Sequence, residues 1–145
     1  MILYLDTSAL AKAYVEEDFS AEIKAVLEKA SIAATHQITF VEFHAALARA
    51  FREGRIREEQ QKIAMQEFVR DWPGFLKIEI SDPLLARASR ACEIFALRAY
   101  DGLHLAAAEF LLKKTGEPFL FAAFDRRLNS AADFLEMEIL RGLGW

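Results

Sequence analysis

The sequence predicts an α/β fold in which a mostly parallel sheet of four or five strands is flanked by helices. Strand-like and helix-like segments alternate along the chain, with no internal repeat and no linker rich in proline or glycine. The first and last strand candidates are apolar throughout, which is typical of a parallel sheet buried on both faces. A length of 145 residues, 54% of them hydrophobic, suits one core, so we expect a single domain over residues 1–145.

The first half of the chain begins with a strand and is otherwise mainly helical. Residues 2–5 (ILYL) form the first apolar run. A helix at 57–72 carries apolar residues at i, i+3, i+4 and i+7 from Met65, the spacing of an amphipathic helix, and Gly54 separates it from the helix before. The predicted elements of this half are, in order, a strand at 2–5, helices near 8–14 and 20–30, a strand around 31–35, and helices at 37–51 and 57–72.

The second half of the chain returns twice to the sheet. Residues 75–80 alternate apolar and polar side chains, which predicts a strand near one edge. Asp82 and Pro83 suit a helix start, while Gly116 and Pro118 mark a helix end. The predicted elements are a strand at 75–80, helices at 82–97 and 100–114, a strand at 119–124, a helix at 126–132, and a short fifth strand at 137–140 before a glycine-rich end at 142–145.

Cysteine content and the amino-terminal residues limit the class of protein. Cys92 is the one cysteine, so an internal disulfide and a cysteine-based zinc site are excluded and a reducing compartment is favoured. No basic leader precedes the apolar stretch at 2–5, and no run approaches the ~18 apolar residues that a membrane span needs. We therefore expect a cytoplasmic protein without a membrane span.

Charge is distributed unevenly along the chain. The net charge of −4 lacks the basic footprint that nucleic-acid-binding proteins usually carry. Arginines nevertheless gather at residues 49–57 and at Arg126 and Arg127. The favoured interpretation of the first group is a solvated helix end, where arginine complements the helix dipole. Both groups are also candidates for contacts to nucleic-acid phosphates.

Four acidic residues stand where a strand is expected to end or a helix to begin. They are Asp6, Glu42, Asp101 and Asp125. In parallel α/β sheets such positions gather at the carboxyl edge, where ligands bind at the point of topological reversal. Carboxylates that are buried together repel one another unless a cation binds or their pKa values rise. Mg²⁺ and Mn²⁺ prefer oxygen ligands and also bind phosphate oxygens, so this pattern favours a metal site for phosphodiester hydrolysis.

Helix capping is the alternative explanation for the same acids, because Asp and Glu are favoured at helix starts. Thr39 and Glu42 have the spacing of a capping box. Asp6 and Asp125 could each be an N-cap. The apolar sequence around Asp6, Asp101 and Asp125 predicts that these side chains are partly buried, which favours the metal site over capping alone.

The residues around the four acids form motifs in a fixed order. The motifs are residues 5–10 (LDTSAL), 41–42 (VE), 100–108 (YDGLHLAAA) and 124–128 (FDRRL). Together they resemble a PIN domain, and most of all the small VapC-type ribonuclease toxins of type II toxin-antitoxin systems. The resemblance covers essentially the full length of the chain. Any one motif is a weak signal, whereas all four in the family's order and approximate spacing form a fairly specific one.

This resemblance implies a PIN-like domain that acts as a metal-dependent endoribonuclease and hydrolyses RNA phosphodiester bonds. The residues that it implies as catalytic and as ligands of Mg²⁺ or Mn²⁺ are Asp6, Glu42, Asp101 and Asp125. Asp6 and Asp101 are the first candidates for direct contact with the metal, and Glu42 and Asp125 would complete the charge. Thr7 or Ser8 would orient these carboxylates.

The resemblance also implies partners. They are a structured RNA substrate, a cognate antitoxin that inserts a peptide segment into or beside the acidic site, and a second copy of the chain in a homodimer. The amphipathic helix at 57–72 offers apolar surface for such a contact, although core packing is its favoured use.

The chain departs from the PIN pattern near the last acid. The family often has Thr or Ser two residues before it, whereas this chain has Ala123. Loss of that hydroxyl would weaken metal affinity, because outer-shell partners hold ligands in place. Asn129 lies one helical turn after Asp125 and could supply a polar contact there, although a solvent-facing or capping asparagine is the favoured interpretation.

The histidines raise the alternative of a zinc or iron hydrolase. His36, His44 and His104 lack the His-Glu-x-x-His spacing of a metalloprotease helix. His44 follows Glu42 by two residues and should point elsewhere on an ideal helix. His104 can share a face with Asp101, but a structural histidine with satisfied hydrogen bonds is the favoured interpretation.

Two other functional classes fit parts of the sequence. Asp6 after a strand is found in phosphoryl-transfer enzymes with an aspartate nucleophile, but Ser8 stands where their second aspartate would be. A non-catalytic PIN-like module that binds RNA or protein is the stronger alternative, with its acids serving only as caps. Neutralising Asp101 distinguishes the two, because only a nuclease would lose activity.

Overall fold

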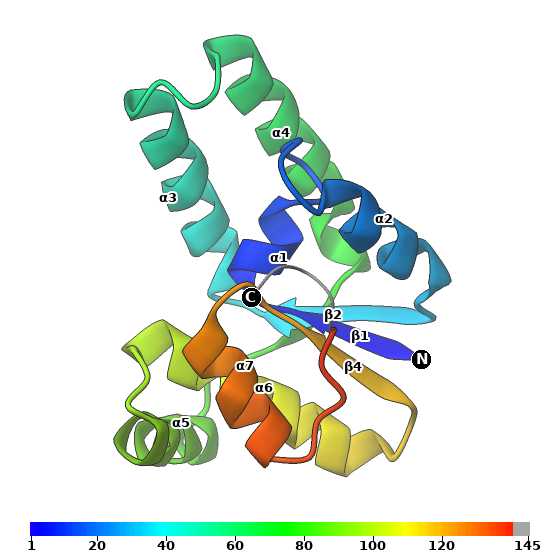
Figure 1. Ribbon diagram of the computed structural model, residues 1–145, viewed down its shortest axis with the longest axis vertical. Coiled ribbons are helices and arrows are strands. Elements are labelled where there is room, and N and C mark those ends of the chain that lie inside the picture. Colours follow the sequence, from blue (N-terminus) through cyan, green and yellow to red (C-terminus); the bar gives the residue numbers. More distant parts are fainter. Residues whose placement is uncertain (141–145) are drawn as a thin grey trace.

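A four-stranded parallel sheet with the order β3-β2-β1-β4 forms the centre of the molecule (Figure 1). It is seen in a computed structural model that describes residues 1–140; the glycine-rich end predicted at 142–145 lies outside them. The strands are β1 (Ile2–Leu5), β2 (Ile32–His36), β3 (Leu76–Ile78) and β4 (Phe119–Ala122). The α/β prediction is confirmed, and β3 lies at the sheet edge as its alternating sequence predicted.

Helices cover both faces of the sheet. In Figure 1, α1 to α4 lie on one side of the sheet, with α3 and α4 forming a long hairpin, and α5 to α7 lie on the other side. The helices are α1 (Thr7–Ala11), α2 (Ser20–Lys29), α3 (Thr39–Arg52), α4 (Glu58–Asp71), a 3₁₀ turn η1 (Trp72–Gly74), α5 (Asp82–Phe95), α6 (Ala99–Thr115) and α7 (Arg126–Phe134).

The apolar residues of β1 pack alternately into two hydrophobic cores, one on each face of the sheet. Successive side chains of a strand point to opposite faces, so Ile2 and Tyr4 pack among residues of α5, α6 and α7. Leu3 and Leu5 pack among residues of α1, α2, α3 and α4. All four side chains are at most 1% exposed. A strand with helices on both faces has no solvent-facing position, which explains why its sequence lacks polar residues.

The strand order places the reversal of chain direction between β1 and β4. The chain moves from β1 to β2 and β3 on one side, and then returns to form β4 on the other side of β1. The amide of Asp6 donates to the carbonyl of Ala122 at 3.0 Å, which extends this pairing past the end of β1. The carboxyl ends of β1 and β4 therefore meet at the switch point where open α/β sheets bind ligands.

The structure differs from the sequence prediction in local details. The fifth strand predicted at 137–140 is only an isolated bridge between Ile139 and Phe121, although it covers the free edge of β4. The first helix ends at Ala11 rather than near residue 14. Val69, predicted on the apolar face of α4, is 48% exposed. Along residues 1–140, no helix combines the length and apolar character that crossing a bilayer requires.

Candidate active site

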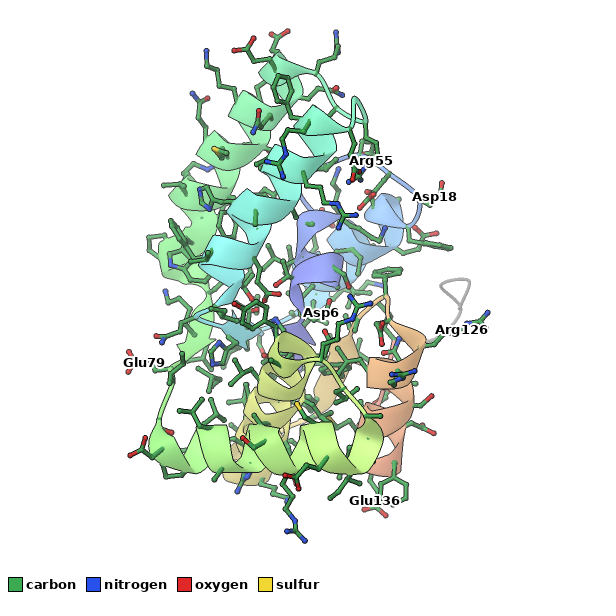
Figure 2. The ribbon with its side chains drawn as sticks, turned by 90° about the vertical axis from the view of Figure 1, so that its left-hand side faces the viewer. Asp6, Asp18, Arg55, Glu79, Arg126 and Glu136 are labelled. Carbon is green, nitrogen blue, oxygen red and sulfur yellow. The ribbon has the colours of Figure 1, made fainter. Side chains whose placement is uncertain are left out.

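The four predicted acids lie around the carboxyl edge of the sheet. Asp6 follows β1, and Asp125 precedes α7 in the connection after β4. Glu42 lies in the first turn of α3, and Asp101 lies in the first turn of α6. Figure 2 shows Asp6 near the middle of the molecule, between the two helical layers. The topology therefore brings residues from nearly the whole chain to one edge.

Asp6 is a buried carboxylate held by local hydrogen bonds. It is 4% exposed, and its Oδ1 accepts from the Ala9 amide at 2.8 Å, so it is the N-cap of α1. The Ser8 hydroxyl lies 2.7 Å from Oδ1 and 2.9 Å from Oδ2. Burial raises the pKa of Asp6 to about 6, and the negative charge of Asp101 adds to the rise. The nearby His104 side chain, and then the bonds from Ala9 and Ser8, act to lower the pKa of Asp6.

The Ser8 hydroxyl also joins the ends of β1 and β4. It donates to Asp6 and accepts from the amide of Phe124 at 3.0 Å. The predicted role of Ser8 in orienting an acid therefore has a geometric basis. Through this one hydroxyl, the position of the Asp6 carboxylate depends on the loop that leads to Asp125.

Glu42 contacts residues of other elements and does not cap its own helix. Its Oε1 accepts from the Thr7 hydroxyl at 2.7 Å and lies 2.8 Å from Nε2 of His104. The predicted capping box is wrong, because α3 has no side-chain cap and the Thr39 hydroxyl bonds to that of Thr35 at 2.8 Å. Burial acts to raise the pKa of Glu42, but the hydrogen bonds from His104 and Thr7 outweigh it and hold the pKa below its ordinary value.

Asp101 and Asp125 both line a cavity of about 300 Å³. The other lining residues are Ala96, Leu97, Arg98, Arg126 and Arg127. Burial and the negative charge of Asp125 raise the pKa of Asp101. Asp125 itself is exposed, so its predicted burial is wrong. It caps α7 instead, with Oδ1 accepting from the Leu128 amide at 2.8 Å.

The four acids are close enough to influence one another's pKa values, but they are not arranged as a complete set of metal ligands. Asp101 interacts with Asp6, Asp125 and Glu42 strongly enough that each pair contributes to a pKa shift. Within residues 1–140, however, no three His, Cys, Asp or Glu side chains are arranged to bind one ion together. This open arrangement of oxygen donors suits a hard cation that keeps several waters and takes further oxygens from a substrate phosphate.

The arginine groups have different surroundings. Arg49 and Arg55 both pair with Glu53, at 2.8 and 2.9 Å. Figure 2 shows Arg55 near the outer end of the α3–α4 hairpin, away from Asp6, in agreement with the interpretation of this group as a solvated helix end. Arg127 donates to the carbonyl of Ala96 at 2.8 Å, whereas Arg126 is exposed and makes no hydrogen bond or ion pair within the described residues.

His44 lies outside the acid network, whereas His36 lies beside it, with its ring centroid 6.2 Å from that of His104. Nδ1 of His44 lies 2.6 Å from the Phe40 carbonyl, so His44 points away from Glu42 as predicted. His36 is fully buried, and its Nδ1 accepts from the Ile38 amide at 2.9 Å. Burial lowers the pKa of His36 to about 4. Neither residue gives the zinc or iron site that the histidine content raised as an alternative.

His104 is buried and hydrogen-bonded, as predicted for a structural histidine, but its partner is one of the acids. It is 1% exposed, with Nε2 beside Glu42 and Nδ1 3.0 Å from the hydroxyl of Tyr4. Sequence reasoning missed Tyr4, because it lies in an apolar run that a core strand explains fully. The one signal that could have indicated it is its position two residues before Asp6, which places both side chains on the same face of the strand.

The connection before Asp125 is fixed by other contacts, although Ala123 lacks the hydroxyl that the PIN family often has at this position. Ala123 is 3% exposed and packs in the core beneath the sheet. Asn129 is 1% exposed rather than solvent-facing, and its Nδ2 donates to the Ala123 carbonyl at 2.9 Å. The favoured interpretation of Asn129 as a solvent-facing or capping residue is therefore wrong. The loop is fixed from one side by Asn129 and from the other by the Ser8 bond to Phe124.

Comparison with known proteins places this arrangement in a family. A PIN domain family model matches residues 3–133. Ribonuclease VapC49 of Mycobacterium tuberculosis (strain ATCC 25618 / H37Rv) is 29% identical over 132 residues, which cover 90% of this chain and 89% of that protein.

Solved structures share the fold. FitAcB from Neisseria gonorrhoeae has a TM-score of 0.67 at 17% identity, covering 97% of each chain. VapC20 of Mycobacterium tuberculosis, a toxin that cleaves the sarcin-ricin loop, has a TM-score of 0.61 at 17% identity, covering 89% of this chain and 94% of that one. These identities establish the fold alone. Because the family model spans most of its length, the chain belongs to the PIN domain family.

Proposed function

We propose that the protein is a metal-dependent endoribonuclease that hydrolyses RNA phosphodiester bonds and acts as the toxin of a toxin-antitoxin pair. The observation that carries this proposal is the buried carboxylate of Asp6, which lies at the switch point of the sheet and has a pKa raised to about 6. A buried acid with acidic neighbours is costly unless a cation offsets the charge. The similarity to Ribonuclease VapC49 supports RNA as the substrate.

The donor set fits Mg²⁺ or Mn²⁺. All four candidate ligands offer carboxylate oxygens, and Asp6 and Asp101 would hold the ion directly, with Glu42 and Asp125 completing the charge. When bound, the cation would supply Lewis acidity that activates a water and stabilises the charge developing on the phosphate. Thr7 and Ser8 would keep the Glu42 and Asp6 carboxylates in place, through the hydrogen bonds described above.

The basic residues around the Asp101–Asp125 cavity would position the RNA. Arg98 and Arg126 are exposed and line the same cavity as these acids. A phosphodiester that approaches the acids must overcome their negative charge, and nearby guanidinium groups reduce that cost. In the α3–α4 hairpin, Arg49 and Arg55 are both paired with Glu53, which makes Arg126 a better candidate than either.

Arg126→Ala is expected to weaken RNA binding several-fold and to reduce the slope of log affinity against log salt by about 1. Arg127→Ala is the matched comparison, because the Arg127 guanidinium already donates to the Ala96 carbonyl. It should change the salt slope less and should loosen the contact between α5 and α7. The affinity and the salt slope of both variants are measured by binding a labelled RNA hairpin across a salt series. All proteins in this assay also carry Asp101→Asn, which is expected to prevent cutting. An unchanged slope for Arg126→Ala would argue against its role.

The proposed function is tested by incubating purified protein with pooled cellular RNA in Mg²⁺, Mn²⁺ or EDTA. Cleavage should require the metal and should fall at least about 100-fold in Asp101→Asn, beyond the usual loss for an outer-shell residue. The variant should remain folded, since it removes one half-buried charge. Asp18→Asn, at an exposed residue that Figure 2 shows apart from Asp6, is the matched control and should cut normally. Equal or absent cutting in wild type and Asp101→Asn would favour a non-catalytic RNA- or protein-binding module.

The partners and location that the family resemblance implies stay part of this proposal. A cognate antitoxin would insert a peptide beside the acidic site, and basic side chains of such a peptide would be attracted by the charge of Asp101 and Asp125. A homodimer and a cytoplasmic location are the corresponding predictions for assembly and compartment. Co-expression with small neighbouring open reading frames tests the antitoxin, and the absence of any stable complex would contradict it.

A further inference from the structure

The side chain of Glu42 is held by a buried chain of hydrogen bonds, here called the relay, that runs from Tyr4 of β1 through His104 to Glu42. Tyr4 of β1 is 0% exposed, and its ring stacks on that of Phe121 at 5.7 Å with an interplanar angle of 9°. Its hydroxyl lies 3.0 Å from Nδ1 of His104. On the other side of the imidazole, Nε2 lies 2.8 Å from Oε1 of Glu42. The relay thus connects β4, β1, α6 and α3.

The chemistry of the two partners fits both ring nitrogens. A glutamate carboxylate accepts hydrogen bonds, so Nε2 of His104 donates to Glu42. The Tyr4 hydroxyl can donate or accept, so it is a suitable partner for Nδ1 whether or not that nitrogen carries a proton. Each nitrogen of the buried ring therefore has a partner of the right kind, and together the two partners fix the ring orientation.

Both hydrogen bonds to Glu42 end on the same oxygen. Thr7 and His104 each meet Oε1, and in the part of the chain that the structure describes Oε2 accepts no hydrogen bond. The carboxylate is therefore anchored by one oxygen while the second is left for another ligand. An apolar residue at position 104 would leave Glu42 with Thr7 alone and would leave the buried Tyr4 hydroxyl without a partner.

We propose that His104 is a positioning residue of the nuclease site, which acts through Glu42 and is itself fixed by Tyr4. This inference rests on the proposed function, because Glu42 is taken as one of the residues that hold the cation. Outer-shell partners of this kind typically account for about 10–100-fold in metal affinity or activity. His104 supplies no direct contact to the substrate.

The experiment compares two substitutions of His104 by titration of Mn²⁺, followed as loss of the free-ion electron paramagnetic resonance signal without RNA. His104→Leu removes the donor at similar volume and should weaken Mn²⁺ binding by about 10–100-fold. His104→Gln retains an amide donor near the place of Nε2 and should recover most of the affinity. In cleavage assays the Leu variant should lose kcat while KM for RNA stays unchanged, because RNA contacts are not altered.

His44→Leu is the matched control, because His44 lies on the same helix as Glu42 but bonds to the Phe40 carbonyl. It should bind Mn²⁺ as the wild type does. Wild-type affinity in His104→Leu, or a Gln variant no better than Leu, would overturn the inference. If the Leu variant does not fold, Tyr4→Phe replaces it: weaker Mn²⁺ binding supports the relay, and unchanged binding overturns it. Failure of the proposed function is distinguishable, because Asp101→Asn would then also cut like wild type.

Discussion

Asp6→Asn is expected to abolish metal-dependent RNA cleavage and, at the same time, to stabilise the metal-free protein at neutral pH. The loss of activity should be at least about 100-fold, because Asp6 is a proposed direct ligand and outer-shell losses alone reach that size. The gain in stability follows from burial, since a buried ionised carboxyl is disfavoured in the folded state. Asparagine retains an oxygen for the Ala9 amide and polar atoms for Ser8.

The sign of the stability effect depends on pH. Burial raises the pKa of Asp6 from 3.8 to about 6 in the folded protein, so the folded state binds this proton more tightly than the unfolded state does. The free energy of unfolding of the wild type should therefore fall as pH rises from about 4 to about 6, by up to about 3 kcal/mol, and then level off. Asp6→Asn should lack this fall.

Urea unfolding in EDTA across this pH range measures the difference between wild type and variant. Asp125→Asn is the matched control, because it makes the same substitution at another helix N-cap but at an exposed carboxylate. Its stability should change little, since Asn and Asp are similar N-caps. A flat difference between wild type and Asp6→Asn from pH 4 to pH 7 would contradict the inferred burial cost. Added Mn²⁺ should raise the free energy of unfolding of the wild type at pH 7, because a bound cation offsets the buried charge of Asp6. It should not change the free energy of unfolding of Asp6→Asn.

Gly102→Ala is expected to destabilise the protein and to impair cleavage, although alanine is the better helix former. A Cβ at this position would lie 2.3 Å from Sγ of Cys92 and 3.0 Å from the carbonyl oxygen of Ala88. Overpacking of this kind costs about 1–3 kcal/mol, against a helix-propensity gain of about 1 kcal/mol. The difference is a net loss of up to about 2 kcal/mol. The neighbouring Asp101 would move with the first turn of α6.

A double-mutant cycle identifies the cause. Cys92→Ala removes the sulfur and should recover most of the stability and activity of Gly102→Ala, leaving only the tight approach to Ala88. Gly74→Ala is a suitable control, because an added Cβ there meets nothing within 4 Å. Thermal and urea unfolding with cleavage rates provide the measurements. Wild-type stability in Gly102→Ala would mean that α5 and α6 separate at little cost.

The sequence predicted the parts of the fold and site that depend on local pattern. The apolar runs identified β1 and β4, and the acids after them were expected to be caps or site residues. Asp6 and Asp125 are both N-caps, and Asp6 is also a buried member of the acidic edge. Capping and a role in the site therefore coexist at one residue, because an N-cap after a parallel strand lies at the ligand-binding edge by geometry.

Long-range partners explain what the sequence could not predict. The Thr39–Glu42 spacing indicated a capping box. In the structure the Thr39 hydroxyl bonds to Thr35 on the preceding strand, and Glu42 bonds to Thr7, which is 35 residues away and which no local pattern reveals. The predicted solvent exposure of Asp125 and of Asn129 was also wrong. Asp125 follows an apolar strand yet is exposed, while the polar Asn129 is buried because its amide meets the Ala123 carbonyl. In each case tertiary packing decided between two conformations that the local sequence allowed.

The pairing of β4 with β1 has a consequence for biosynthesis. Domains fold as the chain emerges from the ribosome, amino-terminal parts first, so Asp6 and Glu42 are present long before β4 has been made. Until β4 docks against β1, Ser8 lacks its bond to Phe124, and Asp125 is absent from the cavity that it shares with Asp101. The proposed nuclease site should therefore stay incomplete, and the nascent chain inactive, until β4 has been made and has docked against β1.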